Sequence, residues 1–483
     1  MRTRAPKYLL GAAFGAVAST LLIGTSAYAE DLDPVAKLGE QTSLLWVVIG
    51  AVLVIFMQAG FALVETGFTQ KKNAAEVMST NFAIFGLGFI GFLFVGFPLA
   101  FAGFSTVPGQ FGLSPMNGTG LPAVGGEFTG IFYWGYSHLG DAATPALLGF
   151  FLYMVAFMDT TATIPTGSMA ERWKWKSFVW WGLFCGAIYY PLFAAWTWGG
   201  GWLSQLGNSM NWGVGYADFA GSGVVHAVGG VAGLAGALVL GPRIGKYNAD
   251  GSPNTIPGHH IPMAMLGTFI LLFGWFGFNA ASTFAATDIR FAVVAANTAI
   301  AGAFGAVTAM FFMQIKTGKP DPGMMVNGML GGLVAITAPC AFVQPWAAAV
   351  IGIIAGVLIP VAANFIEKRG VDDPVGAVAV HGIGGTFGVL AVGIFADGQY
   401  GAGWNLTTTT KEGVTGILYG GDGWGQLLSQ FVGVLVIWTV IFGIAFAFFK
   451  IQNKLTKGGI RVSEQEEIDG VDIAEMGVTA YAD

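Results

Sequence analysis

The sequence predicts an all-α polytopic membrane protein with eleven transmembrane helices, built as an inverted five-plus-five repeat plus a final helix. Three observations carry this prediction. Apolar residues make up 54% of the 483-residue chain and charged residues only 10%, whereas a soluble domain has about 25% charged residues. Eleven segments are long and apolar enough to cross a bilayer. Two copies of one motif lie five segments apart.

Each predicted segment has roughly the 20 residues that a helix needs to span a bilayer. The segments are 43–66, 79–104, 143–169, 177–199, 219–241, 261–282, 290–314, 324–342, 346–366, 373–396 and 426–449. The eighth is the weakest of them, because it is rich in glycine and contains Pro339.

Positive charge orients these segments. Fifteen Lys and Arg residues lie in alternate connections and in the tail, against only Arg290 and Lys411 in the other connections. The positive-inside rule assigns the richer side to the cytoplasm. The N-terminus is then extracytoplasmic and the C-terminus cytoplasmic, in an inner (plasma) membrane protein.

The two ends of the chain have their own patterns. Basic residues, a run of small apolar residues and Ala27-Tyr-Ala29 indicate a cleavable signal peptide at 1–29; an uncleaved first span is the alternative. We expect an extracytoplasmic segment at 30–42, a membrane domain at 43–449 and a cytoplasmic regulatory tail at 450–483.

A repeated motif opens the fifth and tenth segments. Its copies are Asp218-Phe-Ala-Gly-Ser-Gly-Val-Val-His226-Ala-Val-Gly-Gly230 and Asp373-Pro-Val-Gly-Ala-Val-Ala-Val-His381-Gly-Ile-Gly-Gly385. An odd offset means that the copies cross the bilayer in opposite directions, as in inverted repeats. Each His lies eight residues, about 12 Å, along a helix from its Asp. Both imidazoles should therefore meet near the middle of the membrane.

Ionisable groups at that depth are a functional-site hypothesis by default. The alternative is that both imidazoles hydrogen-bond to helix backbones and only join the repeats. Asp218 and Asp373 each precede a helix, so we expect them to act as N-caps. At Asp218 the negative charge would also favour cations.

Other site chemistries find little support in the sequence. Two His without Cys or Glu at ligand spacing make an incomplete metal set, and Cys185 and Cys340 both lie in apolar surroundings. We expect no metal and no cofactor. No nucleophile–base pair indicates an enzyme, and no basic block indicates a nucleic-acid partner.

Aromatic residues mark the expected outer end of the pore. Trp275, Phe278 and Ser282 are spaced three and four apart, so they share one helical face. Ser282 offers a hydroxyl acceptor, and Phe278 lies one turn deeper, where it could occlude a pore. Trp198 stands beside a glycine run and could hold a cation against its ring; an aromatic belt at the membrane interface is the alternative for this region.

Together these motifs resemble those of the ammonium transporter (Amt/Mep/Rh) family, on its bacterial and plant Amt side. The residues that carry the resemblance are Asp218–His226, Gly274–Asn279, Ala170-Glu-Arg172, Asp372-Asp-Pro374, Val380-His-Gly382 and Ile460–Glu467. The resemblance implies a homotrimer in the lipid bilayer with one pore per subunit. It also implies ammonium, ammonia or methylammonium as cargo.

The resemblance assigns roles to particular residues. Asp218 corresponds to the acid that supports the outer cation site, with Trp198 and Ser282 as its walls. Phe157 and Phe278 correspond to the stacked gate. His226 and His381 correspond to the twin-His pair of the pore, and the tail to the segment that meets a PII-type signal protein in relatives.

Asp159 departs from the family pattern, which usually has small apolar residues after the outer gate residue. It either hydrogen-bonds to a neighbouring helix or adds an acceptor to the conduction path; both alternatives stay open.

The predicted function is ammonium transport. The protein would recruit ammonium at the outer site, deprotonate it and conduct ammonia through an apolar pore lined by the two His. Two alternatives remain, an ammonium sensor and a neutral ammonia channel of the Rh type. The tail after residue 450 has about 34 residues, which is short for an output domain.

Overall fold

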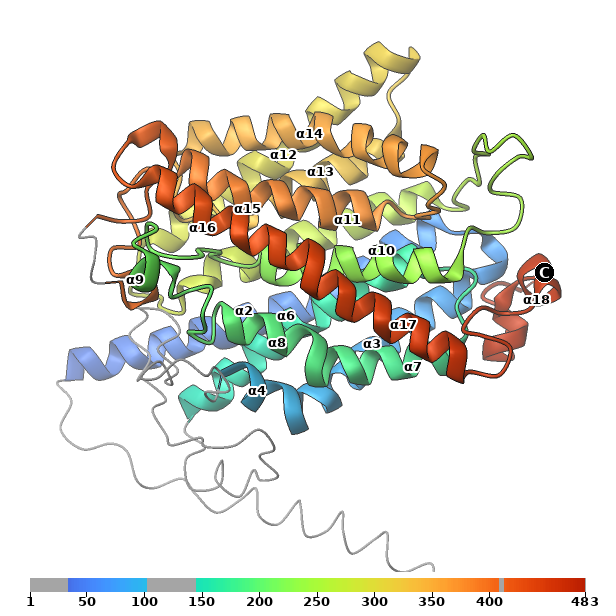
Figure 1. Cartoon of the computed structure of the whole chain (residues 1–483), viewed down its shortest axis with the longest axis horizontal. Coiled ribbons are helices and arrows are strands. Elements are labelled where there is room, and N and C mark those ends of the chain that lie inside the picture. Colours follow the sequence, from blue (N-terminus) through green and yellow to red (C-terminus); the bar gives the residue numbers. More distant parts are fainter. Residues whose placement is uncertain (1–33, 102–144, 408–411, 483) are drawn as a thin grey trace, which may run out of the picture.

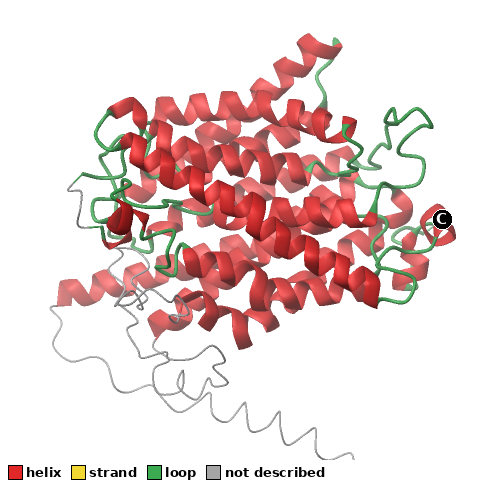
Figure 2. Ribbon diagram, viewed as in Figure 1, coloured by secondary structure: helices red, strands yellow, loops and turns green. Residues whose placement is uncertain are grey.

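The computed structural model describes residues 34–101, 145–407 and 412–482. The predicted signal peptide at 1–29 lies outside these ranges, so it remains a prediction. Within them the chain folds into helices and forms no β-sheet (Figure 2). Ten helices in the described ranges are long and apolar enough to cross a membrane, and a shorter apolar helix makes an eleventh.

The helices lie roughly side by side and form one bundle (Figure 1). In chain order they are α2 (Pro34–Phe68), α3 (Ala74–Gly91) with α4 (Phe97–Phe101), α6 (Pro145–Met169), α7 (Trp175–Phe184) with α8 (Tyr190–Trp196), α10 (Val228–Leu240), α11 (Ile261–Trp275), α12 (Arg290–Thr317), α13 (Pro322–Thr337), α14 (Pro345–Lys368), α15 (Gly384–Phe395) and α16 (Gly423–Val436) with α17 (Phe442–Leu455).

Two short helices mark the two ends of this bundle. Helix α9 (Leu206–Met210) lies at one end, and α18 (Glu464–Asp469) lies at the other with the C-terminus (Figure 1). We call these the α9 end and the tail end. Single π-helical turns interrupt several spans, and two of them, Ser222–Ala227 and Val378–Ile383, contain the two motif histidines.

Several boundaries differ from the sequence prediction, and three of them affect the ends of the bundle or the site. Helix α2 begins at Pro34, inside the segment expected to precede the first span. Helix α17 runs on to Leu455, past the expected start of the tail. Both extensions include charged residues, Lys37 and Glu40 in the first and Lys450 and Lys454 in the second, so hydropathy alone did not include them.

The third difference is α13, which ends at Thr337 instead of 342. Pro339 has no backbone N–H, so it cannot continue the helical hydrogen bonds. The freed carbonyl groups of Thr337 and Ala338 accept hydrogen bonds from the backbone N–H groups of Ala220 and Phe219, at 3.2 and 3.1 Å. The short eighth helix therefore holds the segment that follows Asp218.

The two motif segments cross antiparallel, as the inverted repeat requires. Ser222 approaches Gly385, His226 approaches His381, and Gly230 approaches Gly382. A Cβ atom at Gly230 would lie 2.1 Å from the backbone nitrogen of Gly382, and one at Gly385 would lie 2.4 Å from the carbonyl oxygen of Ser222. The second glycine of each motif thus lets the two backbones touch.

Candidate functional site

Both motif aspartates bind the start of their own helix. Asp218 Oδ1 accepts a hydrogen bond from the backbone N–H of Gly221, and Oδ2 accepts from Gly223 and Val224, all at 2.8–2.9 Å. Asp373 accepts from the backbone N–H groups of residues 377 and 378. The expected N-capping is confirmed, and both oxygens of Asp218 are occupied by backbone donors.

A glycine with positive φ makes each of these caps possible. Gly221 has φ +116° and Gly376 has φ +79°, a conformation that glycine adopts readily and that residues with a Cβ atom avoid. Both lie three residues after their aspartate, which is the spacing that the two motif copies share.

The two histidines meet inside the bundle. The Nδ1 atoms of His226 and His381 are 3.2 Å apart, and the ring centroids are 5.2 Å apart with 24° between the planes. Both side chains are buried. A hydrogen bond between the two Nδ1 atoms needs one proton, so one ring donates while the other accepts. The Nε2 atom of His226 has no hydrogen-bond partner.

Aromatic rings continue from the pair in both directions. Phe278 stacks on His226 at a centroid distance of 5.3 Å, and Phe157 stacks on Phe278 at 4.0 Å with 21° between the planes. On the other side Phe61 lies 6.0 Å from His381. The five rings form a continuous file through the core, with the two imidazoles in the middle.

The α9 end of this file carries the polar groups predicted for an outer site. The Trp198 indole N–H donates to the carbonyl oxygen of Asp218 at 2.8 Å, and its ring packs edge-on against Phe157 at 5.8 Å. The Ser282 hydroxyl donates to the carbonyl oxygen of Phe278 at 2.7 Å. A hydroxyl oxygen has two lone pairs, so at least one remains available to accept a hydrogen bond from a cargo molecule even when Tyr153 donates to the other.

Tyr153 belongs to this region although the sequence did not single it out. Its hydroxyl lies 3.1 Å from the Ser282 hydroxyl, and its ring packs on Phe157 at 4.8 Å. Tyr153 stands one helical turn before Phe157, and that spacing could have identified it.

A cavity continues from His381 towards the tail end. Its wall includes Glu65 and Asn327, and its remaining lining side chains are apolar. Neither residue was among the site residues predicted from the sequence. Among the described residues, no group of three or more His, Cys, Asp or Glu side chains is arranged to hold a metal ion.

Known proteins resemble the chain over nearly its whole length. Residues 45–481 match the sequence profile of the Ammonium Transporter Family. The chain belongs to this family. It is 47% identical over 439 residues to the ammonium transporter Amt2 of Archaeoglobus fulgidus, which covers 90% of this chain and 87% of that protein. It is 34% identical to ammonium transporter 1 member 3 of Solanum lycopersicum, covering 92% of this chain and 94% of that protein.

Solved structures share the ammonium transporter fold. A structure titled "Sensor Amt Protein" is 35% identical, superposes with a TM-score of 0.77, and covers 91% of this chain and 99% of that one. Mep2 of Candida albicans is 26% identical with a TM-score of 0.72, covering 91% of this chain and 90% of that one. These likenesses confirm the predicted helical membrane fold.

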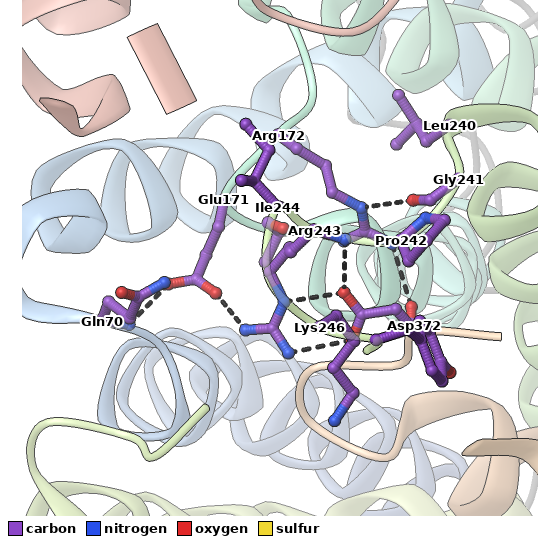
Figure 3. A network of polar contacts seen from close by, with 12 residues as sticks. Gln70, Glu171, Arg172, Leu240, Gly241, Pro242, Arg243, Ile244, Lys246 and Asp372 are labelled. Carbon is purple, nitrogen blue, oxygen red and sulfur yellow. Dashed lines mark hydrogen bonds and ion pairs between the residues drawn. The ribbon is translucent and has the colours of Figure 1, made fainter. Parts of the chain in front are cut away.

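Two motifs that resemble the ammonium transporter family, Ala170-Glu-Arg172 and Asp372-Asp-Pro374, meet at Arg243, as Figure 3 shows. Arg243 pairs with Glu171 and, through Nε and a terminal nitrogen, with both carboxylate oxygens of Asp372 at 2.8 and 2.9 Å. Arg172 donates to the carbonyl oxygen of Asp372. Burial opposes the charge on Asp372, but the hydrogen bonds and positive charge of Arg243 and Arg172 outweigh it and lower the pKa of Asp372 to about 2.

The tail motif joins this network. Arg461 pairs with Glu467 and donates to the carbonyl oxygen of Leu240 at 3.0 Å. Glu467 accepts from the backbone N–H of Ile244 at 2.7 Å. Asp472 accepts from the backbone at the start of α3, at 2.9–3.0 Å. The tail is therefore bound to the connections after the first and fifth spans.

Asp159 is buried within α6, and its Oδ1 atom has no hydrogen-bond partner. No hydrogen bond to a neighbouring helix was found for this carboxyl group among the described residues. The alternative that it adds an acceptor to the path therefore stays open.

Proposed function

We propose that this member of the ammonium transporter family recruits ammonium at the α9 end, removes a proton and conducts ammonia along the file of rings past the two histidines. The observation that carries the proposal is the hydrogen-bonded pair His226–His381 in the middle of that file. A hydrogen-bonded imidazole pair can pass a proton, because each ring nitrogen either donates or accepts. On the side of the pair that faces the α9 end, the neighbouring rings of Phe278 and Phe157 offer no acceptor to solvate an intact cation.

The proposed outer site explains selection of ammonium over potassium. Ammonium donates four hydrogen bonds, whereas potassium donates none. The Ser282 hydroxyl supplies an acceptor, and the faces of Trp198 and Phe157 attract a cation. Asp218 acts through its negative charge and by fixing the helix start, since both its oxygens are already bound by backbone N–H groups.

Beyond Phe278 the path is apolar, and moving an unpaired ion into such surroundings carries a very large free-energy cost. Neutral ammonia avoids most of that cost. We therefore place the loss of the proton at the stacked pair Phe157–Phe278, which closes the path in this conformation with a centroid distance of 4.0 Å.

The same proposal includes the cellular setting. The distribution of Lys and Arg assigns the tail end to the cytoplasm, and an inner (plasma) membrane location follows. Family resemblance supports a homotrimer and a PII-type protein as partner of the tail.

Ammonium-evoked currents test the function. Purified protein in proteoliposomes on a solid-supported membrane should give a saturable current with ammonium and none with potassium. His226→Ala and His381→Ala should each abolish transport or its coupling to charge and leave ammonium recruitment at the outer site intact. Wild-type ammonium flux and unchanged selectivity in both single variants would refute the role of the pair.

A sensor function is the second candidate, because the chain resembles the structure titled "Sensor Amt Protein" along 99% of that chain. A sensor that transports little would bind ammonium without uptake into proteoliposomes. A neutral channel of the Rh type would alkalinise the vesicle interior and give no saturable current. The same preparation therefore separates all three possibilities.

A further inference from the structure

The cavity between His381 and the tail end contains two polar groups that the proposed mechanism leaves unused. Glu65 comes from α2 and Asn327 from α13, and both line the cavity together with His381. Both side chains are buried, with 2% and 4% of their surfaces exposed. Polar groups kept inside a membrane bundle are costly and commonly mark a permeation path.

Asn327 presents an unused acceptor. Its Nδ2 atom donates to the carbonyl oxygen of Val375 at 3.2 Å, which fixes the orientation of the amide. The Oδ1 atom has no partner. A buried acceptor without a partner costs about 1–3 kcal/mol. A cargo molecule that donates hydrogen bonds would satisfy it.

The polar neighbours of Glu65 are compatible with either a carboxylate or a carboxylic acid. Glu65 Oε2 accepts a hydrogen bond from Asn81 Nδ2 at 2.6 Å, and both carboxyl oxygens of Glu65 lie 2.9 Å from the Thr166 hydroxyl. That hydroxyl has one proton and also lies 2.5 Å from the carbonyl oxygen of Thr163. When the hydroxyl donates to Thr163, its contact with Glu65 requires a proton on the carboxyl group.

In the part of the chain that the structure describes, no positive side chain pairs with this acid. None of the ion pairs among the described residues includes Glu65. The backbone makes room for its carboxyl group at Gly167, where a Cβ atom would lie 3.0 Å from Glu65 Oε1 and 2.5 Å from Val375 Cγ2. The pocket is thus shaped around a carboxyl group that has no structural counter-ion.

We propose that Glu65 and Asn327 form an inner ammonium site, in which Glu65 returns a proton to the ammonia that has passed the histidine pair. The inference rests on the proposed function. The O–H bond of the Glu65 carboxylic acid breaks, a fourth N–H bond forms, and Asn327 Oδ1 accepts one N–H of the new ammonium ion. The remaining carboxylate regains the proton that the cargo lost at the outer site, passed on by His381 through water.

The test separates charge movement from the passage of ammonia. Wild-type protein, Glu65→Gln and the control Glu40→Gln are reconstituted in proteoliposomes. Glu40 is an exposed residue of the same helix. The ammonium-evoked current of Glu65→Gln should fall at least about tenfold, the low end of what a positioned acid–base group contributes. Internal alkalinisation by ammonia should persist, and the control should match wild type.

Each of the other outcomes overturns either the inner site alone or the proposed function together with it. A Glu65→Gln current at the wild-type level overturns the inner site and leaves the proposed function intact. Loss of both current and ammonia passage assigns Glu65 a structural role and also overturns the inference. Absence of any ammonium-dependent current in wild type overturns the proposed function, and the inner site with it.

Infrared difference spectroscopy gives a second measurement that does not depend on the variant's activity. Adding ammonium to reconstituted wild-type protein should change the carbonyl stretching band of a protonated carboxylic acid. The change should be lost in Glu65→Gln and kept in Glu40→Gln. A wild-type spectrum without any ammonium-dependent carboxylic acid band would rule out proton return by Glu65.

Discussion

Replacing Gly385 by alanine should separate the two motif segments. The new Cβ atom would lie 2.4 Å from the Ser222 carbonyl oxygen and 2.8 Å from the Ala227 nitrogen. Both are backbone atoms, so neither can rotate away. An ordinary contact needs about 3.5 Å, and the segments must therefore move apart by about 1 Å.

That displacement is enough to break the histidine pair. The Nδ1 atoms of His226 and His381 are 3.2 Å apart, already at the long end of a hydrogen bond between nitrogen and its acceptor. A further separation of about 1 Å leaves them unbonded. Forcing a methyl group into a packed core also destabilises the fold by about 1–3 kcal/mol.

Two measurements with a matched control test this reasoning. Thermal unfolding of purified Gly385→Ala in detergent should shift to lower temperature. Because the proton-passing pair is broken, its ammonium-evoked current should fall at least about tenfold, the low end of what a positioned acid–base group contributes. A Cβ atom at Gly86 or Gly443 meets nothing within 4 Å, so alanine at either position should leave both properties unchanged. If Gly385→Ala matched wild type in both, close packing would not position the imidazoles.

Three further predictions concern the ends of the bundle. Asp218→Asn should lower thermal stability by about 1–3 kcal/mol, because an amide has one acceptor oxygen whereas backbone N–H groups now reach two; an unchanged melting temperature would contradict the cap. Folding lowers the pKa of Asp372 to about 2, so its carboxylate stabilises the folded state above pH 4. The free energy of unfolding should fall by about 2 kcal/mol as pH falls from 4 to 2. Thermal melts across that range should show the loss in wild type and a smaller one in Asp372→Asn. Glu467→Ala removes the acceptor for Ile244 and Arg461, so trypsin should cut the tail faster than in Glu464→Ala, whose side chain is exposed.

Much of the fold was predictable from sequence, because a membrane helix needs a long apolar run. The spacing of the repeat then determines that the two motif helices cross the bilayer in opposite directions. The boundaries that differed depend on other physics. Residues 34–42 form helix although they are largely exposed and include Lys37 and Glu40. Helix α13 stops early because Pro339 follows it and because the segment after Asp218 provides partners for its free carbonyl groups. Neither feature leaves a hydropathy signal.

The candidate site was predictable where the residues of one motif, such as an Asp and its His, lie within a single segment. The Asp-to-His spacing places both imidazoles at one depth, and the structure brings them together. Glu65 was missed because its partners, Asn81 and Thr166, come from two other helices. A signal did exist, since Glu65 is an acid within the predicted span 43–66, and acids in such spans are rare.

The buried acids Asp218, Asp373 and Glu65 differ in their hydrogen-bond partners. This difference distinguishes acids that stabilise a helix start from an acid that can transfer a proton. Asp218 is bound by backbone N–H groups, which can only donate and therefore favour a permanent anion. Asp373 has the same kind of partners. The hydroxyl beside Glu65 can donate to a carboxylate or accept from a carboxylic acid. Glu65 is thus the acid, of these three, whose surroundings suit both states that proton transfer requires.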